Sequence, residues 1–258
     1  MGPTRLPPYA VRRSPRAMRA SGTAATPSGW DAEYARRGIP SSYRTEPSEA
    51  VVRTLDEWPR LGPGGAIARR GLDVGCGTGR NTAYAASRGT AMTGFDSSAA
   101  AIDAARRRIA GHDLPCELLV HDLEDGLPAG DGEIDLVLDV FVYKHQLSPE
   151  ARRRHRAELA RVLAPGGLVL LSLAQPGDGY YGGCPAWPDP DAGPNAVVDP
   201  VTGVGSVLFS LDALAEEVRD VLTLVMAWTK EKPGWMHGRR YTRRTLATVW
   251  RSRARPVP

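Results

Sequence analysis

Short apolar runs alternate with amphipathic stretches along most of this 258-residue chain. The runs at 134–140 and 168–173 are apolar at almost every position, which is typical of parallel strands buried on both faces. Between them, 148–163 carries apolar side chains at helical spacing and many arginines on its other face. Strand-helix-strand units of this length pair in parallel through right-handed crossovers. The pattern therefore predicts an α/β fold with a doubly wound sheet.

The same pattern places further strands and one closing hairpin. Three more parallel strands are expected near 72–74, 91–96 and 117–121. Two β-rich runs, 222–228 and 240–250, are joined by 233–238, which contains Pro and two Gly residues. Such an arrangement is typical of an antiparallel hairpin. The sheet is therefore expected to end with an antiparallel pair.

Length and composition predict one domain with tails. A chain of this size with 42% hydrophobic residues buries one large core. Residues 1–29 are rich in Pro, Arg, Ser and Gly and predict a disordered leader, although an acid-free, Arg-rich start is also found in transit peptides. Ordered structure is expected from Trp30, with helices over 30–60, one domain to 250 and a basic tail at 251–258. The Ala-, Arg-, Gly- and Pro-rich usage is typical of a bacterial gene of high GC content.

The net charge of +4 comes from the ends of the chain. Residues 1–29 carry five arginines and 238–258 carry seven, with no acid in either stretch, and removing both leaves 21 basic against 29 acidic residues. A net charge of −8 for the body argues against a nucleic-acid partner, which requires a basic stripe beside the cleft. No apolar run approaches the roughly 20 residues that span a bilayer, and the N-terminus lacks the apolar core of a secretory signal. We therefore expect a cytoplasmic protein without a membrane partner; the sequence carries no signal for an oligomeric state.

The three cysteines predict free thiols. Cys76, Cys116 and Cys184 lie far apart and lack the spacing of metal ligands. Neither a disulfide framework nor a metal site is expected.

The main chemical motif is a glycine loop between the first strand and the following helix. Gly75, Gly77 and Gly79 permit backbone torsions closed to other residues and let a ligand lie against bare main chain. Dinucleotide sites use G-x-G-x-x-G, which Arg80 interrupts here. Asp73 would repel a pyrophosphate but suits a ligand that carries an ammonium. The charge pattern favours S-adenosylmethionine over NAD.

The stretch Leu72-Asp73-Val74-Gly75-Cys76-Gly77-Thr78-Gly79 resembles the first motif of class I S-adenosylmethionine-dependent methyltransferases. The resemblance continues through most of 47–250. It implies a Rossmann-like, seven-stranded, mostly parallel sheet with an antiparallel last strand. It also implies that the cofactor contacts come from the N-terminal helices, the glycine loop and the strand ends: Trp30, Tyr34, Arg44, Asp73, Gly75, Cys76, Gly77, Gly79, Asn81, Asp96, Ser97, Asp122, Leu123, Asp139 and Val140.

Several of these residues have a second interpretation. An acid at the end of the second strand, here Asp96, accepts the ribose hydroxyls in this architecture, but it could instead cap the helix that begins at Ser97. The resemblance places Asp122 and Leu123 at the adenine. Trp30, Tyr34 and Arg44 precede the glycine loop, where family members have helices that cover the cofactor, with Arg44 on its carboxylate. Aromatic packing and a solvated arginine are the alternative.

The acceptor site is expected after the fourth strand and in a long irregular segment. His145 follows that strand, where ligands bind in open α/β sheets, and it could act as a general base or as a structural hydrogen-bonding histidine. The segment 174–209 mixes aromatic residues with glycines and predicts a lid. Tyr143, Tyr180, Tyr181 and His237 are the other candidates to contact the acceptor.

The acceptor is expected to be a small molecule, either a natural product or a xenobiotic, methylated on O, N or S. The continuation Gly79-Arg80-Asn81-Thr82 and the hairpin with His237 look similar to tellurite-resistance-type and thiopurine-type enzymes. Methyl transfer is an in-line displacement, so positioning of the acceptor is the main contribution of the enzyme. An RNA or protein methyltransferase, an aminopropyl-transferring enzyme and a non-catalytic S-adenosylmethionine-binding protein are the alternatives.

Overall fold

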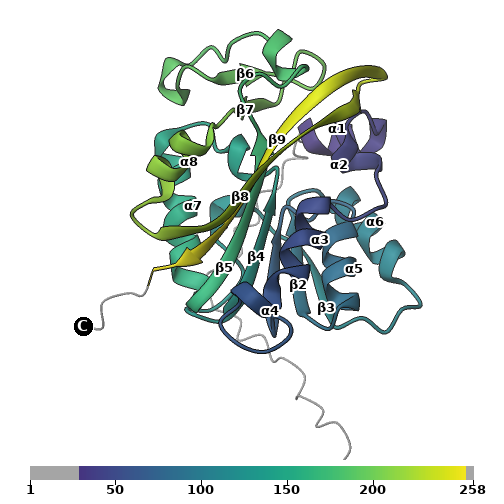
Figure 1. Ribbon diagram of the computed structural model, residues 1–258. Helices are drawn as coiled ribbons and strands as arrows, with labels where there is room; N and C mark the ends of the chain where they lie inside the picture. Colours follow the sequence, from purple (N-terminus) through teal and green to yellow (C-terminus); the bar gives the residue numbers. More distant parts are fainter. Residues whose placement is uncertain (1–28, 254–258) are drawn as a thin grey trace, which may run out of the picture.

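The computed structural model describes residues 29–253, and one seven-stranded sheet runs through its centre (Figure 1). The strand order is β3-β2-β1-β4-β5-β9-β8. The strands are β1 (Arg70–Val74), β2 (Ala91–Asp96), β3 (Cys116–Val120), β4 (Ile134–Val140), β5 (Leu163–Ala174), β8 (Leu222–Met236) and β9 (Arg239–Ser252). Only β9 runs against its neighbours β5 and β8. The predicted fold class, with an antiparallel last strand, is confirmed.

Helices cover both faces of the sheet. They are α1 (Gly29–Arg36), α2 (Pro40–Tyr43), α3 (Glu49–Asp56), α4 (Trp58–Leu61), α5 (Arg80–Ser87), α6 (Ala99–Ile109), α7 (Pro149–Val162) and α8 (Leu211–Val218). Alternate residues of β4 point to opposite faces, as the pleat requires. Leu136 and Leu138 pack with α3, α4 and α5, whereas Val137 packs with α7 and α8. This explains why the strand is apolar throughout.

The closing hairpin is longer than the sequence pattern predicts. The segment 233–238, expected as a loop, lies mostly in β8, and the turn is reduced to His237 and Gly238. Both have positive φ values, 47° and 75°, as the first and second residues of a type I′ turn do. Pro233 is tolerated because β8 is the edge strand and a missing N–H there breaks no ladder.

The segment 174–209, predicted to be irregular, contains a second small sheet. Its strands are β6 (Ala196–Val198) and β7 (Gly205–Val207), and single 3₁₀ turns occur at Tyr181–Gly183 and Pro190–Ala192. Figure 1 shows this insertion above the upper ends of the central strands, beside α1 and α2. It therefore lies at the carboxyl ends of the parallel strands, where the glycine loop follows β1.

The expected helices over 30–60 are four short ones, and one other boundary differs from expectation. Strand β9 continues to Ser252, so 251–252 belong to the sheet rather than to the tail. The predicted leader, apart from Gly29, and the end of the tail lie outside the described residues. Within 29–253, none of the helices is both long and apolar enough to cross a bilayer.

Candidate active site

A cavity of about 300 Å³ opens at the carboxyl ends of β1, β2 and β4. Its wall combines the glycine loop, the segment after β4, the α1–α2 region, the insertion and the hairpin. Ten predicted site residues line it: Trp30, Tyr34, Gly75, Asp96, Ser97, Asp122, Leu123, Val140, His145 and Tyr181. Ten others do not: Arg44, Asp73, Cys76, Gly77, Gly79, Asn81, Asp139, Tyr143, Tyr180 and His237.

The glycine loop is tightly covered. Gly75, Gly77 and Gly79 have φ values of 55°, 56° and 74°, which favour glycine. A Cβ at Gly75 would lie 2.6 Å from Val142 Cγ2, and one at Gly77 would lie 2.7 Å from the Tyr34 hydroxyl oxygen. Any larger residue would push the covering side chains away.

Asp96 joins the glycine loop to the second strand. Its Oδ2 accepts hydrogen bonds from the Gly77 amide at 2.9 Å and from the Tyr34 hydroxyl at 3.4 Å, and Oδ1 accepts from the Ser98 amide at 2.9 Å. Burial raises the pKa of Asp96, while the two amides oppose that rise. The side-chain cap of α6 is Ser98, whose Oγ accepts from the Ala101 amide at 3.2 Å. Asp96 therefore leaves the side-chain capping role to Ser98 and faces the cavity.

Asp73 lies beneath the loop. Its side chain is 1% exposed and accepts a 2.6 Å hydrogen bond from Thr82 Oγ1. Burial raises its pKa to about 7, against the hydrogen bond from Thr82 and the charge of Arg80. Asp73 is therefore buried beneath the cavity wall, and the predicted contact of its carboxylate with a ligand ammonium is not found.

The arginine that reaches the cavity is Arg80 and not the predicted Arg44. Burial lowers the pKa of Arg80, and the charge of Arg44 lowers it further, so the two cations lie close together. Asn81 faces inward and its Oδ1 accepts from the Ser48 amide at 2.8 Å, which ties α5 to the start of α3. Asn81 is therefore a packing residue here.

The far end of the cofactor side is formed by β2 and β3. Asp122 Oδ1 accepts from the Glu124 amide at 2.9 Å, and Leu123 follows it in the wall. His121 and Phe95 also line the cavity and their rings meet edge to face at 5.4 Å. This end combines one carboxylate with aromatic and aliphatic surfaces.

The side chains of the turn after β4 point in two directions, toward the cavity or into the core. Phe141 has a φ of 69°, and a 3₁₀ turn follows at Tyr143–His145. Phe141, Lys144 and His145 face the cavity, whereas Tyr143 points into the core, where its hydroxyl meets Glu217 at 3.3 Å. The predicted role of Tyr143 at the acceptor is corrected accordingly.

Asp139 stabilises that turn from below. It is fully buried, and its Oδ1 accepts from the amides of Tyr143 at 2.9 Å and Val142 at 3.2 Å. Its Oδ2 lies 3.2 Å from Nε2 of His155 on α7. Asp139 thus has no face toward the cavity, and its predicted cofactor contact is wrong for this structure.

His145 is held in one tautomer. Its Nδ1 lies 2.7 Å from the Gly205 carbonyl oxygen, which can only accept, so Nδ1 carries the proton and Nε2 keeps a lone pair. Burial lowers the pKa of His145 well below its ordinary value, the charge of Lys144 lowers it further, and the bond to Gly205 opposes both. The ring of Trp30 meets it edge to face at 4.9 Å. His145 is therefore neutral at neutral pH and able to accept a proton.

Two tyrosines of the insertion have different positions. Tyr181 lines the cavity, and its hydroxyl accepts from Lys144 Nζ at 2.7 Å. The ring of Tyr180 packs at 5.2 Å from that of Tyr241 and 5.7 Å from that of His237. Tyr180 supports the wall from behind and does not line it.

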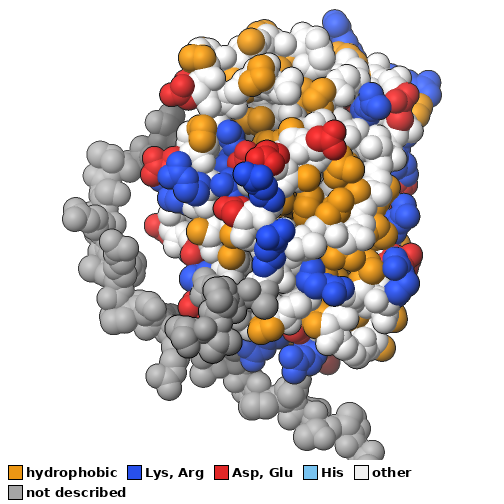
Figure 2. Space-filling model, turned by 60° about the vertical axis from the view of Figure 1, so that its left-hand side comes forward, with side chains coloured by type: hydrophobic (Ala, Val, Ile, Leu, Met, Phe, Trp, Pro, Cys, Tyr) orange, Lys and Arg blue, Asp and Glu red, His pale blue; other side chains and the backbone are white. Residues whose placement is uncertain are grey.

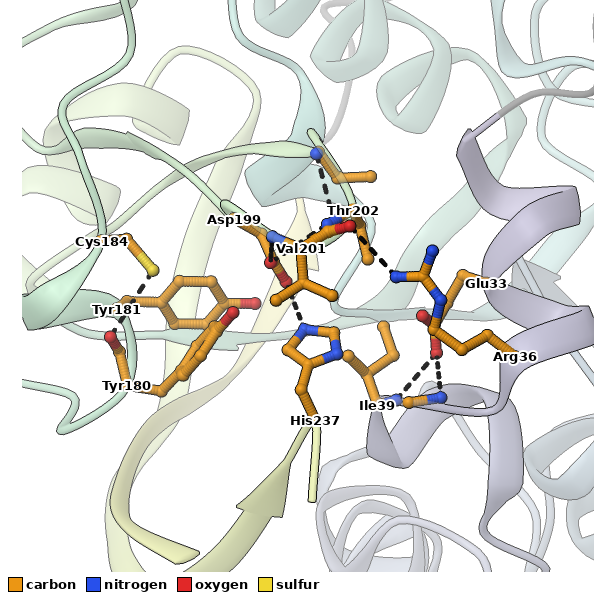
Figure 3. A network of polar contacts seen from close by, with 12 residues as sticks. Glu33, Arg36, Ile39, Tyr180, Tyr181, Cys184, Asp199, Val201, Thr202 and His237 are labelled. Atoms are coloured by element: carbon orange, nitrogen blue, oxygen red, sulfur yellow. Dashed lines mark hydrogen bonds and ion pairs between the residues drawn. The ribbon is translucent and has the colours of Figure 1, made fainter. Parts of the chain in front are cut away.

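His237 connects three separate parts of the chain (Figure 3). Its amide donates to the Gly38 carbonyl at 2.9 Å, and its Nε2 lies 2.8 Å from Asp199 Oδ2. Glu33 Oε1 accepts from the Gly38 and Ile39 amides at 2.7 and 2.8 Å. Because Asp199 and Ile39 line the cavity, His237 fixes its roof without facing the cavity itself.

Several wall residues were not predicted from the sequence. Arg80 and Lys144 are each adjacent to predicted residues and could have been considered on that basis. Asp199, Ser206 and Arg243 reach the cavity only through tertiary packing, and no local pattern marks them. Within 29–253, no group of three or more His, Cys, Asp or Glu side chains is arranged to hold a metal ion.

Comparison with known proteins identifies the domain. Residues 72–167 match the family model described as a methyltransferase domain. An uncharacterized methyltransferase of Synechocystis is 33% identical over 118 residues, which cover 45% of this chain and 50% of that protein. A zebrafish (Danio rerio) tRNA N(3)-cytidine methyltransferase is 32% identical over 126 residues, covering 46% and 34%. The matches thus span half or less of these relatives.

Solved structures agree with the fold. The PH0226 protein of Pyrococcus horikoshii superposes with a TM-score of 0.63 at 19% identity, covering 85% of this chain and 98% of that one. A Burkholderia thailandensis 1,6-didemethyltoxoflavin N1-methyltransferase, solved with bound 1,6-didemethyltoxoflavin and S-adenosylhomocysteine, superposes with a TM-score of 0.54 at 20% identity, covering 80% of this chain and 78% of that one. The fold is that of the Rossmann-like methyltransferases. Residues 72–167 thus match a methyltransferase domain, which agrees with the resemblance of the glycine loop to the first motif of class I S-adenosylmethionine-dependent methyltransferases.

Proposed function

We propose that this protein transfers a methyl group from S-adenosylmethionine to a small-molecule acceptor, a natural product or a xenobiotic. The observation that carries the proposal is one partly open cavity whose wall includes Asp96 at the end of β2 and, on the other side of β1, Lys144 and His145 after β4. Such a cavity holds a cofactor and a small acceptor side by side, which is the requirement for in-line transfer.

The residues present fit the cofactor. The bare backbone at Gly75 allows close approach, and the Asp96 carboxylate suits the two ribose hydroxyls. Asp122 and Leu123 suit the adenine. Arg80 suits the methionine carboxylate. Trp30 and Tyr34 would close over the bound molecule.

The chemistry then needs little more than placement. The bound cofactor supplies a methyl group activated by a sulfonium. The chain contributes a wall that holds the acceptor in line, and His145 Nε2 takes up a proton where the acceptor loses one. The low pKa of His145 makes it a weak base, so this role suits an acceptor that is already acidic.

The shape of the site favours a small acceptor over a polymer. The insertion and the hairpin roof the cavity, tied together by Asp199 and His237. On the face drawn in Figure 2, Lys and Arg side chains are interspersed with acidic and apolar ones and form no continuous basic stripe. RNA methylation is the second candidate, because several relatives are tRNA methyltransferases.

Calorimetry and a labelled-methyl screen test the proposal. We expect S-adenosylmethionine and S-adenosylhomocysteine to bind and NAD to be inert. Pooled metabolites incubated with the methyl-labelled cofactor should give labelled small products, whereas total tRNA should not. Labelled tRNA would establish the second candidate, and cofactor binding with no labelled product in either pool would indicate a non-catalytic binding protein.

A further inference from the structure

A lysine without a carboxylate partner forms part of the acceptor end of the cavity. Lys144 lines the cavity although its residue is only 2% exposed. Its Nζ donates to the Tyr181 hydroxyl at 2.7 Å and to Ser206 Oγ at 2.9 Å. Among residues 29–253, no Asp or Glu forms an ion pair with it. The ammonium is thus removed from water and contacts two neutral hydroxyls and the rings of Tyr181 and Phe141, whose centroids lie 4.3 and 6.0 Å from Nζ, but no carboxylate.

The neighbouring charges do not compensate Lys144. Asp178 is already bound by Arg243 Nε at 2.9 Å. Asp199 accepts from His237 and from the Val201 amide, and these hydrogen bonds outweigh its burial and hold its pKa below the ordinary value. Burying an ammonium without an anion is strongly unfavourable. A site that keeps such a group is prepared for an anion from outside.

The three polar groups converge on the same place. Lys144 has a third N–H to offer, and the hydroxyl groups of Tyr181 and Ser206, which accept from it, each retain a proton to donate. All three residues line the cavity. An ammonium with two hydroxyl donors is suited to the two oxygens of a carboxylate.

The rest of the cavity orients such a ligand. Asp96 ends β2, which is separated by β1 from β4 and from Lys144 after it, and its carboxylate would repel an anion. A cationic cofactor beside Asp96 would leave the acceptor between two positive centres, the sulfonium and Lys144. An acceptor with a negative charge therefore has one favoured end of the cavity.

We propose that the methyl acceptor is a small carboxylic acid and that Lys144, with Tyr181 and Ser206, binds its carboxylate. The inference rests on the proposed function and narrows its substrate class. Lys144 selects for the negative charge of the acceptor, and hydrogen bonds from the two hydroxyls orient its carboxylate. His145, one residue further, lies beside the bound group.

Matched acids and amides test this assignment. Protein saturated with S-adenosylhomocysteine is titrated calorimetrically with benzoate and benzamide, and with indole-3-acetate and indole-3-acetamide. We expect at least one acid to bind ten times more tightly than its amide. Lys144→Met should remove the preference, Lys144→Arg should keep part of it, and Tyr181→Phe or Ser206→Ala should reduce it several-fold.

The control is Lys230→Met, which removes a half-exposed lysine of β8 that is paired with Glu49. It should leave the preference unchanged. Lys144→Met should also melt no lower than the wild type without ligand, since it removes a buried unpaired charge. Equal binding of acid and amide, absence of acid binding in both pairs, or a preference that survives Lys144→Met would overturn the inference. Binding of S-adenosylhomocysteine is measured first on its own, so its failure marks the proposed function and not the carboxylate site.

Discussion

His237 Nε2 lies 2.8 Å from Asp199 Oδ2, and the amide of the same histidine donates to the Gly38 carbonyl at 2.9 Å. These contacts join residues from the hairpin, the insertion and the N-terminal helices. Arg36 Nη1 adds a bond to the Val201 carbonyl at 3.0 Å. The cavity roof is therefore assembled from three segments that are distant in the sequence.

Weakening that junction should speed release of the cofactor product. His237→Ala removes a hydrogen bond to a carboxylate, of the kind that contributes about 1.5–3 kcal/mol. We expect S-adenosylhomocysteine to dissociate roughly tenfold faster in stopped-flow displacement. The control is His112→Gln, a change in an exposed residue of the α6–β3 connection. Equal dissociation rates in the wild type, His237→Ala and His112→Gln would show that the cavity roof does not limit release of S-adenosylhomocysteine.

Asp96→Asn tests the ribose contact. The change keeps the size of the side chain and one accepting oxygen but removes the charge that strengthens bonds from two hydroxyls. The dissociation constant of S-adenosylhomocysteine, measured by calorimetry, should rise at least tenfold, or about 1.4 kcal/mol. Asp103→Asn on the exposed face of α6 serves as the control. An unchanged constant for Asp96→Asn would restrict this residue to holding the loop together.

Asp178→Ala should destabilise the insertion. The carboxylate has no exposure and accepts from the amides of Tyr180, Tyr181 and Arg244 and from the Arg243 side chain. Removing one partner of a buried ion pair costs about 3–5 kcal/mol. The melting temperature should fall by at least about 6 °C. Asp191→Ala, an exposed change in the same insertion, should melt within about 2 °C of the wild type, and a similar result for Asp178→Ala would contradict the assignment.

Asp73 predicts a specific pH dependence of stability. Its folded pKa of about 7 lies above the ordinary 3.8, so the folded protein keeps a proton that the unfolded chain releases between about pH 4 and 7. The unfolding free energy therefore falls as pH rises through that window, by on the order of 4 kcal/mol in total. The Asp73→Asn variant should not lose this stability, because the asparagine side chain does not titrate.

The measurement is the melting temperature of both proteins at pH 5, 6, 7 and 8. The advantage of Asp73→Asn should grow by at least about 5 °C between pH 5 and 8. Other titrating groups are common to both proteins and cancel in the difference. A difference that is constant with pH would mean that Asp73 ionises in the folded state as it does in water.

The parts of the site that follow from local pattern were predictable. Gly75 directly follows β1 and Asp96 is the last residue of β2, and the torsions or charge they supply have few substitutes. The direction of Tyr143 and Lys144 depends on the positive φ of Phe141, which no apolar pattern encodes. The pairing of His237 with Asp199 spans 38 residues and exists only after the hairpin and the insertion have packed.

The fold showed the same division. Periodicity placed β4 at its observed bounds because a strand buried on both faces is apolar at every position. It shortened β8 because Pro233 and Gly234 are turn residues in most contexts, and only the edge position of the strand makes them harmless. Strand bounds that depend on the position of the strand in the sheet cannot be predicted from the local sequence pattern.

The position of β9 has a consequence for synthesis on the ribosome. The strand that closes the gap between β5 and β8 is the last to be made, so the edge of β5 has no partner while residues 175–238 are emerging. An apolar strand such as 168–174 is prone to aggregate in that interval. The cofactor side of the domain is encoded earlier and has its strands in place first. The nascent chain is therefore most in need of a chaperone while residues 175–238 are being made, before β9 can pair with β5.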